Sequence, residues 1–142
     1  MFLPHIFLKY LKLTEALVNE YDVLVLGSST WGAGELQDDW YDGVNVLKKC
    51  DLSHKYVALF GCGDSDSYSD TFCDAIGIIY EDLKDAHCKF CGAVDTAGYT
   101  FDSSIAVVDG KFIGLPIDEV NEDNQTEERI SAWAEQVKQE IS

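Results

Sequence analysis

The sequence predicts an α/β protein in which helices cover both faces of a mainly parallel β-sheet. Two observations lead to this prediction: short apolar runs end in glycine, and helix-like stretches lie between them along the chain. Continuous rather than alternating hydrophobicity is typical of strands that are buried on both faces, as in parallel sheets. Strands that alternate with helices favour right-handed crossovers, so we expect an α/β sandwich.

The elements are expected in the following order. The apolar runs predict strands at residues 23–27, 56–61 and 89–94. Helical spacing of apolar residues predicts helices at 35–49, 69–86 and 126–141. Thr126, which two glutamates follow, is a typical helix start. The apolar stripe of this last helix consists of Ile130, Trp133, Val137 and Ile141.

Composition narrows the classes of function. The chain has 142 residues, of which 46% are hydrophobic, so it can bury the core of one domain. Its net charge of −16 argues against binding to nucleic acids, whose phosphates attract basic residues, and against adsorption to anionic membranes. The same charge favours association with a basic protein surface. No apolar run approaches the roughly 18 residues that a membrane-spanning helix needs.

The cysteines indicate a reducing environment. An odd number of cysteines does not suit a fully paired secreted scaffold, so we expect free thiols and a cytoplasmic location. The opening residues 1–13 lack a basic residue before Lys9 and a cleavage site, so they do not read as an export signal. Cys88 and Cys91 form a C-x-x-C pair, but it precedes a strand instead of opening a helix, so we interpret it as structural. The remaining cysteines are Cys50, Cys62 and Cys73.

Other chemistries find little support in the sequence. Asp64-x-Asp66 begins like a calcium loop, but the sixth position is Ser69 instead of glycine. Neither an H-E-x-x-H nor a G-x-S-x-G motif is present, so no metal site and no catalytic residue is expected. The histidines show no ligand spacing and are expected at the surface: His5, His54 and His87.

Two loops are candidates for a ligand site, because ligands of open parallel sheets bind beyond the carboxyl ends of the strands. Residues 27–34 follow the first strand and residues 61–68 follow the second, and each loop combines glycines with one aromatic residue, Trp31 or Tyr68. Two rings from neighbouring loops can hold a flat conjugated ring by stacking. A purely structural role stays open for each: Trp31 as a cap on the core and Tyr68 as a surface residue.

The same loops resemble those of a known family. Their sequences are S-T-W-G-A-G-E-L-Q-D-D-W (Ser29–Trp40) and V-A-L-F-G-C-G-D-S-D-S-Y-S-D-T-F (Val57–Phe72). Further matching stretches follow in family order: D-A-I-G-I-I-Y-E (Asp74–Glu81), D-T-A-G-Y-T-F (Asp95–Phe101), D-G-K-F-I-G-L-P-I-D-E-V-N (Asp109–Asn121) and E-R-I-S-A-W (Glu128–Trp133). Residues 21–142 thus resemble the flavodoxins, small electron carriers that bind flavin mononucleotide (FMN). Residues 97–115 resemble the extra loop that splits the last strand in the long-chain branch.

The resemblance implies a function and a site. It implies an electron-transfer flavoprotein that carries low-potential electrons on non-covalently bound FMN and converts no substrate. The expected partners are basic-surfaced redox proteins, such as flavodoxin reductases and electron-accepting enzymes. Trp31 and Tyr68 would flank the isoalloxazine ring, and Gly32–Ala33 lies where the redox-linked peptide flip of the family occurs. The cofactor-binding residues implied in this way are Ser29, Thr30, Trp31, Gly32, Ala33, Gly34, Cys62, Gly63, Asp64 and Tyr68.

Residues 1–20 depart from the family pattern. Flavodoxins begin with a strand and a Thr/Ser-x-Thr-Gly-x-Thr loop that cradles the FMN phosphate at a helix N-terminus, and these residues contain no such loop. The sequence therefore predicts one flavodoxin-like domain over 1–142, truncated at its N-terminus, with the strand at 23–27 as an exposed edge open to self-association. Four alternatives can account for this departure. Residues 1–19 fold back over the gap, or the chain comes from a truncated gene, from a misplaced start codon, or as one piece of a split protein.

Two functions follow from this departure. The intact loops favour an electron carrier. Because the phosphate loop is missing, we expect this carrier to bind FMN weakly, and we expect the loss of affinity to be smaller for riboflavin than for FMN. The missing phosphate loop favours a flavodoxin-like remnant or interaction module with weak or no flavin binding.

Acidic residues gather around both loops. A solvated acidic face needs no function, but negative charge near a flavin ring lowers its reduction potential and steers docking onto basic partners. The acidic residues are Glu35, Asp38, Asp39 and Asp42 beside the first loop, and Asp64, Asp66, Asp70 and Asp74 beside the second.

Overall fold

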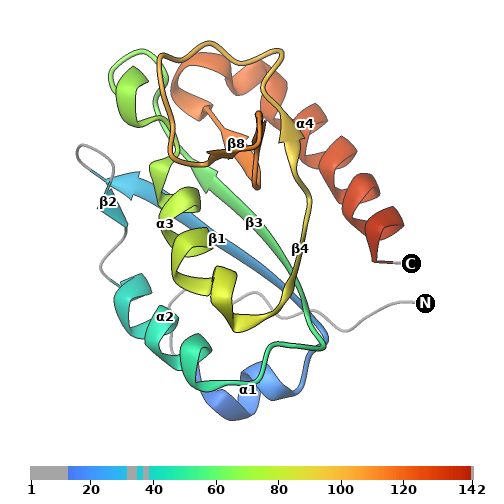
Figure 1. The fold of residues 1–142 in the computed structure, drawn as a ribbon. Coiled ribbons are helices and arrows are strands. Elements are labelled where there is room, and N and C mark those ends of the chain that lie inside the picture. Colours follow the sequence, from blue (N-terminus) through green and yellow to red (C-terminus); the bar gives the residue numbers. More distant parts are fainter. Residues whose placement is uncertain (1–12, 32–34, 37–38, 142) are drawn as a thin grey trace.

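A computed structural model describes residues 13–31, 35–36 and 39–141 of the chain. Its strands are β1 (Val23–Trp31), β2 (Glu35–Leu36), β3 (Tyr56–Cys62), β4 (Lys89–Cys91), β5 (Val94–Asp95), β6 (Val107–Val108), β7 (Lys111–Phe112) and β8 (Leu115–Ile117). Its helices are α1 (Glu15–Asn19), α2 (Asp39–Lys49), α3 (Asp74–Leu83) and α4 (Glu119–Glu140), with short 3₁₀ helices η1 (Ser69–Thr71) and η2 (Lys84–Ala86). The strands form a five-stranded sheet and a small antiparallel sheet of order β5-β7-β6 (Figure 1).

The central strand β3 organises the larger sheet. It pairs with β1 in parallel from Val23↔Tyr56 to Ser29↔Cys62. On its other edge, β4 pairs with the first half of β3 and β8 with the second half, both in parallel. Ser29, Cys62 and Ile117 therefore lie in register across three strands. The carboxyl ends of β1, β3 and β8 consequently form one edge of the sheet, where a ligand site is expected.

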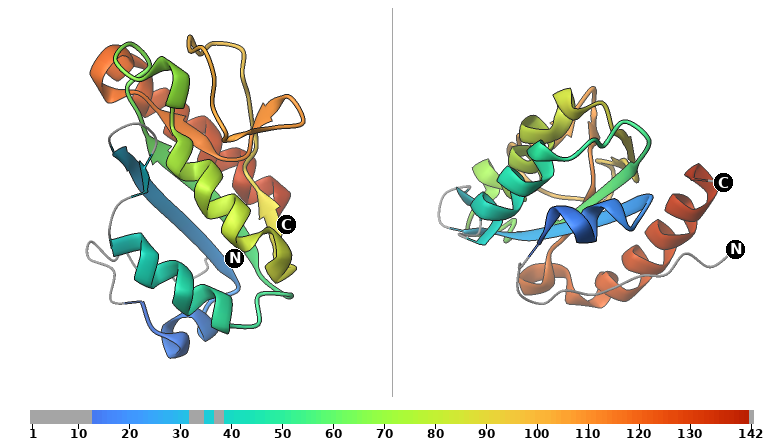
Figure 2. Two further views of the ribbon diagram at one scale, coloured as in Figure 1. Left: turned by 60° about the vertical axis from the view of Figure 1, so that its left-hand side comes forward. Right: turned by 90° about the horizontal axis from the view of Figure 1, so that it is seen from below.

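Helices cover the two faces of this sheet (Figure 2). The core on one face includes side chains of α2 and α3, and the core on the other includes Trp133 and Val137 of α4. Alternate residues of β3 serve both cores: Val57 and Leu59 the first, Ala58 the second. The prediction of an α/β sandwich with a mainly parallel sheet is confirmed.

Gly27 makes room for the core that includes Ala58, Trp133 and Val137. A Cβ on Gly27 would lie 2.1 Å from the Phe60 ring, so only glycine lets this ring lie across β1. Phe60 in turn meets the edge of Trp133, with ring centroids 6.3 Å apart. The Trp133 indole donates a hydrogen bond of 2.8 Å to the carbonyl of Gly92, which fixes α4 against the chain after β4.

Strand β1 differs from the expectation of burial on both faces. Leu24 and Leu26 contribute to the core beneath α2 and α3. Val25, which points to the opposite face, is 52% exposed. The reason is that α4 packs on β8, on the far side of β3 from β1. Among the described residues, the outer edge of β1 pairs only with β2, at Thr30 and Trp31.

Several element boundaries also differ from the predictions. The expected helix at 35–49 begins at Asp39, because Glu35–Leu36 pairs with β1 as β2. The expected helix at 69–86 divides into η1, α3 and η2, since Cys73 has a left-handed φ of 54°. The expected strand at 89–94 is interrupted at Gly92, whose φ is 82°.

The last helix begins earlier in the chain than the predicted start at Thr126. Helix α4 begins at Glu119, because the Asp118 side chain accepts a hydrogen bond of 3.3 Å from the backbone N–H of Asn121. Non-helical dihedral angles at Glu122 (φ −133°, ψ 39°) put a kink after its first turn. Ile130 is 43% exposed, so the predicted apolar stripe does not include it.

The remaining structural predictions concern thiols, histidines and membrane spans. All five cysteines are free, and Cys88 and Cys91 form no disulfide. His54 and His87 are exposed, whereas His5 lies outside the described residues. No helix within the described part of the chain is both long and apolar enough to cross a membrane.

Candidate functional site

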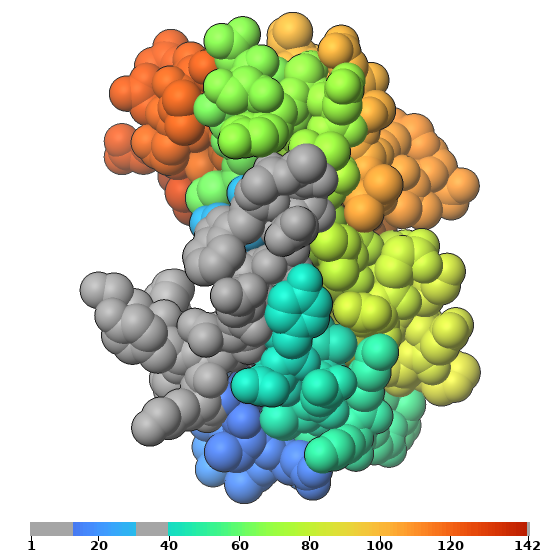
Figure 3. Space-filling model, turned by 90° about the vertical axis from the view of Figure 1, so that its left-hand side faces the viewer, coloured from blue at the N-terminus to red at the C-terminus, as the bar shows by residue number. Residues whose placement is uncertain are grey.

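A cleft of about 200 Å³ lies at the carboxyl ends of β1 and β3. In Figure 3, the surface of residues 61–72 borders the surface of the start of α4, next to the end of β1. The cleft is lined by Ser29, Thr30, Cys62, Gly63, Asp64, Tyr68, Thr71 and Val120. The two loops that the sequence singles out thus meet at one site.

Six of the ten predicted site residues line this cleft: Ser29, Thr30, Cys62, Gly63, Asp64 and Tyr68. The Tyr68 side chain is 48% exposed, so one large aromatic ring is accessible there. The backbone of Trp31 pairs with Glu35, but the Trp31 side chain lies outside the described part of the structure. Gly32, Ala33 and Gly34 also lie outside the described residues.

Sequence reasoning missed two lining residues, Thr71 and Val120. Thr71 lies in η1, three positions after Tyr68. Val120 lies in the first turn of α4, directly after β8, and is 71% exposed. The rule that ligands bind at carboxyl ends of strands would have pointed to Val120, had β8 been recognised as a strand.

Thr30 connects the cleft to helix α3. Its hydroxyl oxygen accepts a hydrogen bond of 3.1 Å from the backbone N–H of Ala75, in the first turn of α3. The residue at the usual capping position, Cys73, makes no side-chain capping bond. Thr30 therefore satisfies one of the amide groups that a helix leaves without an intrahelical partner at its N-terminus.

Gly63 allows close packing at the floor of the cleft. A Cβ at this position would lie 2.8 Å from the Cys73 sulfur and 2.9 Å from the Cys73 backbone nitrogen. The Gly63 N–H donates a hydrogen bond of 2.9 Å to the carbonyl of Ile117, which joins the loop after β3 to the end of β8. Burial raises the pKa of the neighbouring Cys62 thiol, so this sulfur is a packing group and not a reactive thiolate at neutral pH.

Asp64 shapes the turn that leads to Tyr68. Its carboxylate accepts hydrogen bonds from the backbone N–H groups of Ser67 (3.0 Å) and Asp66 (3.2 Å). The side-chain amide of Asn121 donates a third bond of 2.9 Å. The Ser67 amide, and after it Asn121, hold the pKa of Asp64 below its usual value. The site therefore has a fixed negative charge at its rim at neutral pH.

The predicted acidic surface is smaller than expected. Asp42, Asp66 and Asp70 are exposed, but Asp74 is buried, so its assignment to this surface is wrong. The Asp74 carboxylate accepts a hydrogen bond of 2.9 Å from the backbone N–H of Ile105, and burial raises its pKa. The remaining predicted members, Glu35, Asp38 and Asp39, have side chains outside the described part of the structure.

The lining residues suit part of a flat aromatic ligand with polar edges. Those in the described part of the chain supply hydroxyl groups, backbone groups and an aromatic ring, but no Lys or Arg. The volume of about 200 Å³ is below the roughly 300–1,000 Å³ of pockets that enclose a drug-sized ligand. A ligand in this cleft would therefore keep one edge at the surface. Within the described ranges, no group of three His, Cys, Asp or Glu side chains is arranged to hold a metal ion.

Fold and site together define an α/β protein with an open cleft at the carboxyl edge of a mainly parallel sheet. The flavodoxin family model matches residues 9–133. The chain is 44% identical over 124 residues to flavodoxin 1 of Azotobacter vinelandii, covering 86% of this chain and 71% of that protein. It is 46% identical over 127 residues to the flavodoxin of Helicobacter pylori, covering 89% and 76%. The chain belongs to the flavodoxin family.

The fold also matches solved structures. A crystal structure of Fusobacterium nucleatum flavodoxin bound to flavin mononucleotide superimposes with a TM-score of 0.83 at 30% sequence identity. The match covers 88% of this chain and 75% of that chain. The predicted family and the flavodoxin-like fold class are therefore both confirmed.

Proposed function

We propose that this protein carries electrons on FMN, which binds non-covalently with its ring in the cleft at the ends of β1 and β3. As a member of the flavodoxin family, it is an electron-transfer flavoprotein that passes electrons between partner proteins, and not an enzyme that converts a substrate. Bound FMN supplies the redox chemistry. The observation that carries the proposal is the convergence of six predicted ring-site residues on one cleft, in a chain 30% identical to a flavodoxin whose structure contains FMN.

The proposed ring site keeps all ten predicted residues, Ser29 to Gly34, Cys62 to Asp64, and Tyr68. Tyr68 would stack on one face of the ring, because its side chain is exposed at the cleft. Gly63 would let the main chain approach the ring, although its N–H is already used by Ile117. The Asp64 carboxylate, which is held ionised, would disfavour the addition of negative charge to the ring and so lower its reduction potential.

The proposed partners are redox proteins with basic surfaces. The net charge of −16 and the exposed Asp42, Asp66 and Asp70 support this choice, because opposite charges speed the encounter of two proteins. We further propose self-association through the outer edge of β1, which among the described residues pairs only with β2, at Thr30 and Trp31; the exposed apolar Val25 on this edge strand adds support. The five free cysteines support a reducing, cytoplasmic environment.

We also propose that the chain is of the long-chain type and forms a single domain over residues 1–142. The long-chain type is supported by residues 92–114, which lie between β4 and β8 although both strands pair with the same edge of β3. The single domain is supported by β3, whose side chains enter both hydrophobic cores.

One observation favours the alternative of an interaction module that binds flavin weakly or not at all. Among the residues that the structure describes, those that line the cleft include no Lys or Arg to neutralise a phosphate.

A flavin titration of the 142-residue chain tests the proposed function. Quenching of flavin fluorescence is followed with FMN and with riboflavin, on the wild type and on Tyr68→Ala. Loss of a stacked ring costs about 1–3 kcal/mol, so Kd should rise about 5- to 150-fold in the variant. Tyr41→Ala is the matched control, because Tyr41 is 54% exposed on α2 and is not among the described residues that line the cleft.

The outcomes separate the two functions. Comparable Kd values for riboflavin and FMN would support a ring site that lacks a phosphate cradle. FMN that binds far more tightly than riboflavin would contradict that expectation. No quenching from a folded chain would favour the interaction module.

A further inference from the structure

A cluster of polar side chains, of which Asp118 is fully buried, joins the start of α4 to the loop that presents Tyr68, and neither Asp118 nor Asn121 lines the cleft. We infer that Asp118 and Asn121, at the start of α4, are positioning residues that hold residues 64–68 in one conformation. The consequence for flavin affinity rests on the proposed function. The effect on the loop itself does not, because it follows from contacts within the protein.

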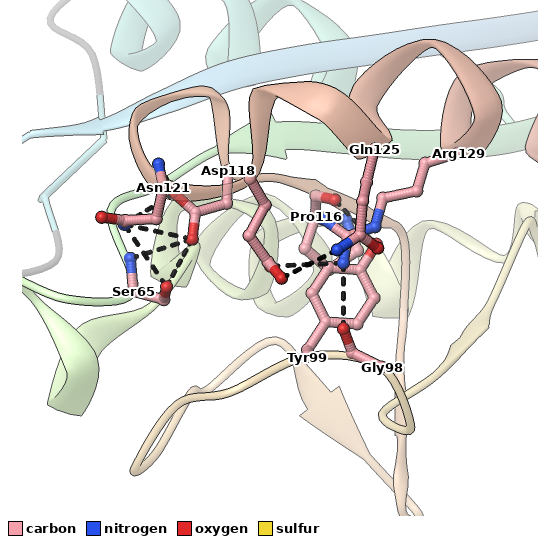
Figure 4. Close-up of polar contacts among 9 residues, drawn as sticks. Ser65, Gly98, Tyr99, Pro116, Asp118, Asn121, Gln125 and Arg129 are labelled. Carbon is pink, nitrogen blue, oxygen red and sulfur yellow. Dashed lines mark hydrogen bonds and ion pairs between the residues drawn. The ribbon is translucent and has the colours of Figure 1, made fainter.

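Asp118 connects α4 to the loop after β3 (Figure 4). This residue is fully buried. Its carboxylate accepts a hydrogen bond from the Ser65 hydroxyl and a longer one, of 3.4 Å, from the Ser65 backbone N–H. It also accepts the helix-capping bond from the Asn121 backbone N–H at 3.3 Å. A buried carboxylate needs such partners, because an unpaired charge away from water is costly.

Asn121 forms a bridge between two carboxylates. Its side-chain amide nitrogen donates to Asp118 Oδ1 and to Asp64 Oδ1, both at 2.9 Å. An amide group has two N–H donors, so one side chain can satisfy both acceptors. The same nitrogen lies 3.4 Å from the Ser65 hydroxyl. These bonds place Asp64 and Ser65 relative to α4, and a donor between the two carboxylates offsets their mutual repulsion.

The bridge extends to the aromatic residue of the cleft. Asp64 accepts the backbone N–H groups of Asp66 and Ser67 through its side chain. Its backbone carbonyl accepts the Tyr68 N–H at 2.9 Å. The conformation of residues 64–68 therefore depends on where the Asp64 side chain lies, and Asn121 fixes that position from a different element. A ring held in one place loses less conformational freedom when a ligand binds, which favours affinity.

The cap of α4 and the support of the loop can be separated by mutation. The capping bond comes from the backbone N–H of Asn121, so Asn121→Ala keeps it and removes only the bridge. Asn121→Gln restores a side-chain amide and is the rescue variant. Asn124→Ala is the matched control, because Asn124 is exposed on the same helix and its side chain makes no hydrogen bond to the described residues. Asp118→Ala is avoided, since it would also remove the helix cap.

Two measurements on the full chain test the inference. Amide hydrogen exchange should be about fivefold faster at Asp66, Ser67 and Tyr68 in Asn121→Ala than in the wild type, which corresponds to one lost hydrogen bond. Exchange in the centre of β3 should not change. Riboflavin and FMN should bind about three- to tenfold more weakly to Asn121→Ala, and Asn124→Ala should match the wild type.

Each outcome of these two measurements either supports or refutes the inference. Equal exchange at residues 66–68 in Asn121→Ala and Asn124→Ala would overturn the inference. Faster exchange with unchanged affinity in a flavin-binding wild type would overturn the functional role of the bridge. If the wild type binds no flavin, the proposed function fails, and the exchange measurement alone still supports or refutes positioning of the loop by Asn121.

Discussion

Replacement of Thr30 by valine should destabilise the protein through a helix that lies far away in the sequence. Valine keeps the shape of threonine and suits a strand equally well, but it removes the oxygen that accepts the Ala75 N–H at 3.1 Å. Ala75 is fully buried, so water cannot replace this acceptor. Loss of a capping bond, or of the partner of a buried donor, costs about 1–2 kcal/mol.

This free energy translates into a measurable change in melting temperature. With an unfolding entropy of about 2.1 cal/mol/K per residue, the 142-residue chain should lose about 3–7 °C in Tm. Thermal unfolding followed by circular dichroism measures this loss. Thr30→Ser retains the hydroxyl and should stay close to the wild type. Thr100→Val, at an exposed position without a hydrogen bond to the described residues, is the control. Equal Tm values for Thr30→Val and Thr100→Val would refute the reasoning.

Three further predictions concern stability, thiol chemistry and assembly. Trp133→Phe removes the indole that donates to the Gly92 carbonyl and leaves a gap in the core, so urea unfolding should show a loss of about 2 kcal/mol; an unchanged midpoint would contradict this role. Burial, assisted by Glu140, raises the pKa of Cys91 to about 11, so the thiolate fraction at pH 8 falls to about one in a thousand. Ellman's reagent should therefore label Cys91 slowly until the pH approaches 11 or the protein unfolds, and rapid labelling of the native protein at pH 8 would refute this. Val25→Lys should abolish self-association through β1 in light scattering, whereas a monomeric wild type would rule out that assembly.

The sequence was sufficient for the features that depend on local pattern. The apolar runs located the cores of β1 and β3, and the two glycine-containing loops after them met at the cleft as expected. Both are determined within a few residues, so they can be read without knowledge of tertiary contacts. The family resemblance added the identity of the ligand, which periodicity alone does not contain.

Features that depend on distant partners were not predictable from local sequence. Asp118 caps α4, yet Thr126 followed by glutamates is the stronger start signal in the sequence. The strand β8 has three residues and is stabilised by pairing with β3, more than 50 positions earlier. Asp74 resembles a member of the acidic surface in the sequence, but it is buried and its carboxylate accepts a hydrogen bond from Ile105, 31 residues away. In each case a contact remote in sequence decides between local alternatives of similar strength.

Strands β4 and β8 pair with the same edge of β3, so the segment between them is a suitable place for inserted residues. The chain leaves this edge after Cys91 and returns to it at Leu115, so β4 and β8 continue one line of pairing on either side of the excursion. Phe112, which is fully buried, anchors the returning segment, while Asp109 and Gly110 at its tip are exposed. Residues added at this tip would change the outline of the molecule without shifting Ile117 against Cys62. Evolution or an engineer can therefore remodel this surface while the ligand-binding edge keeps its register.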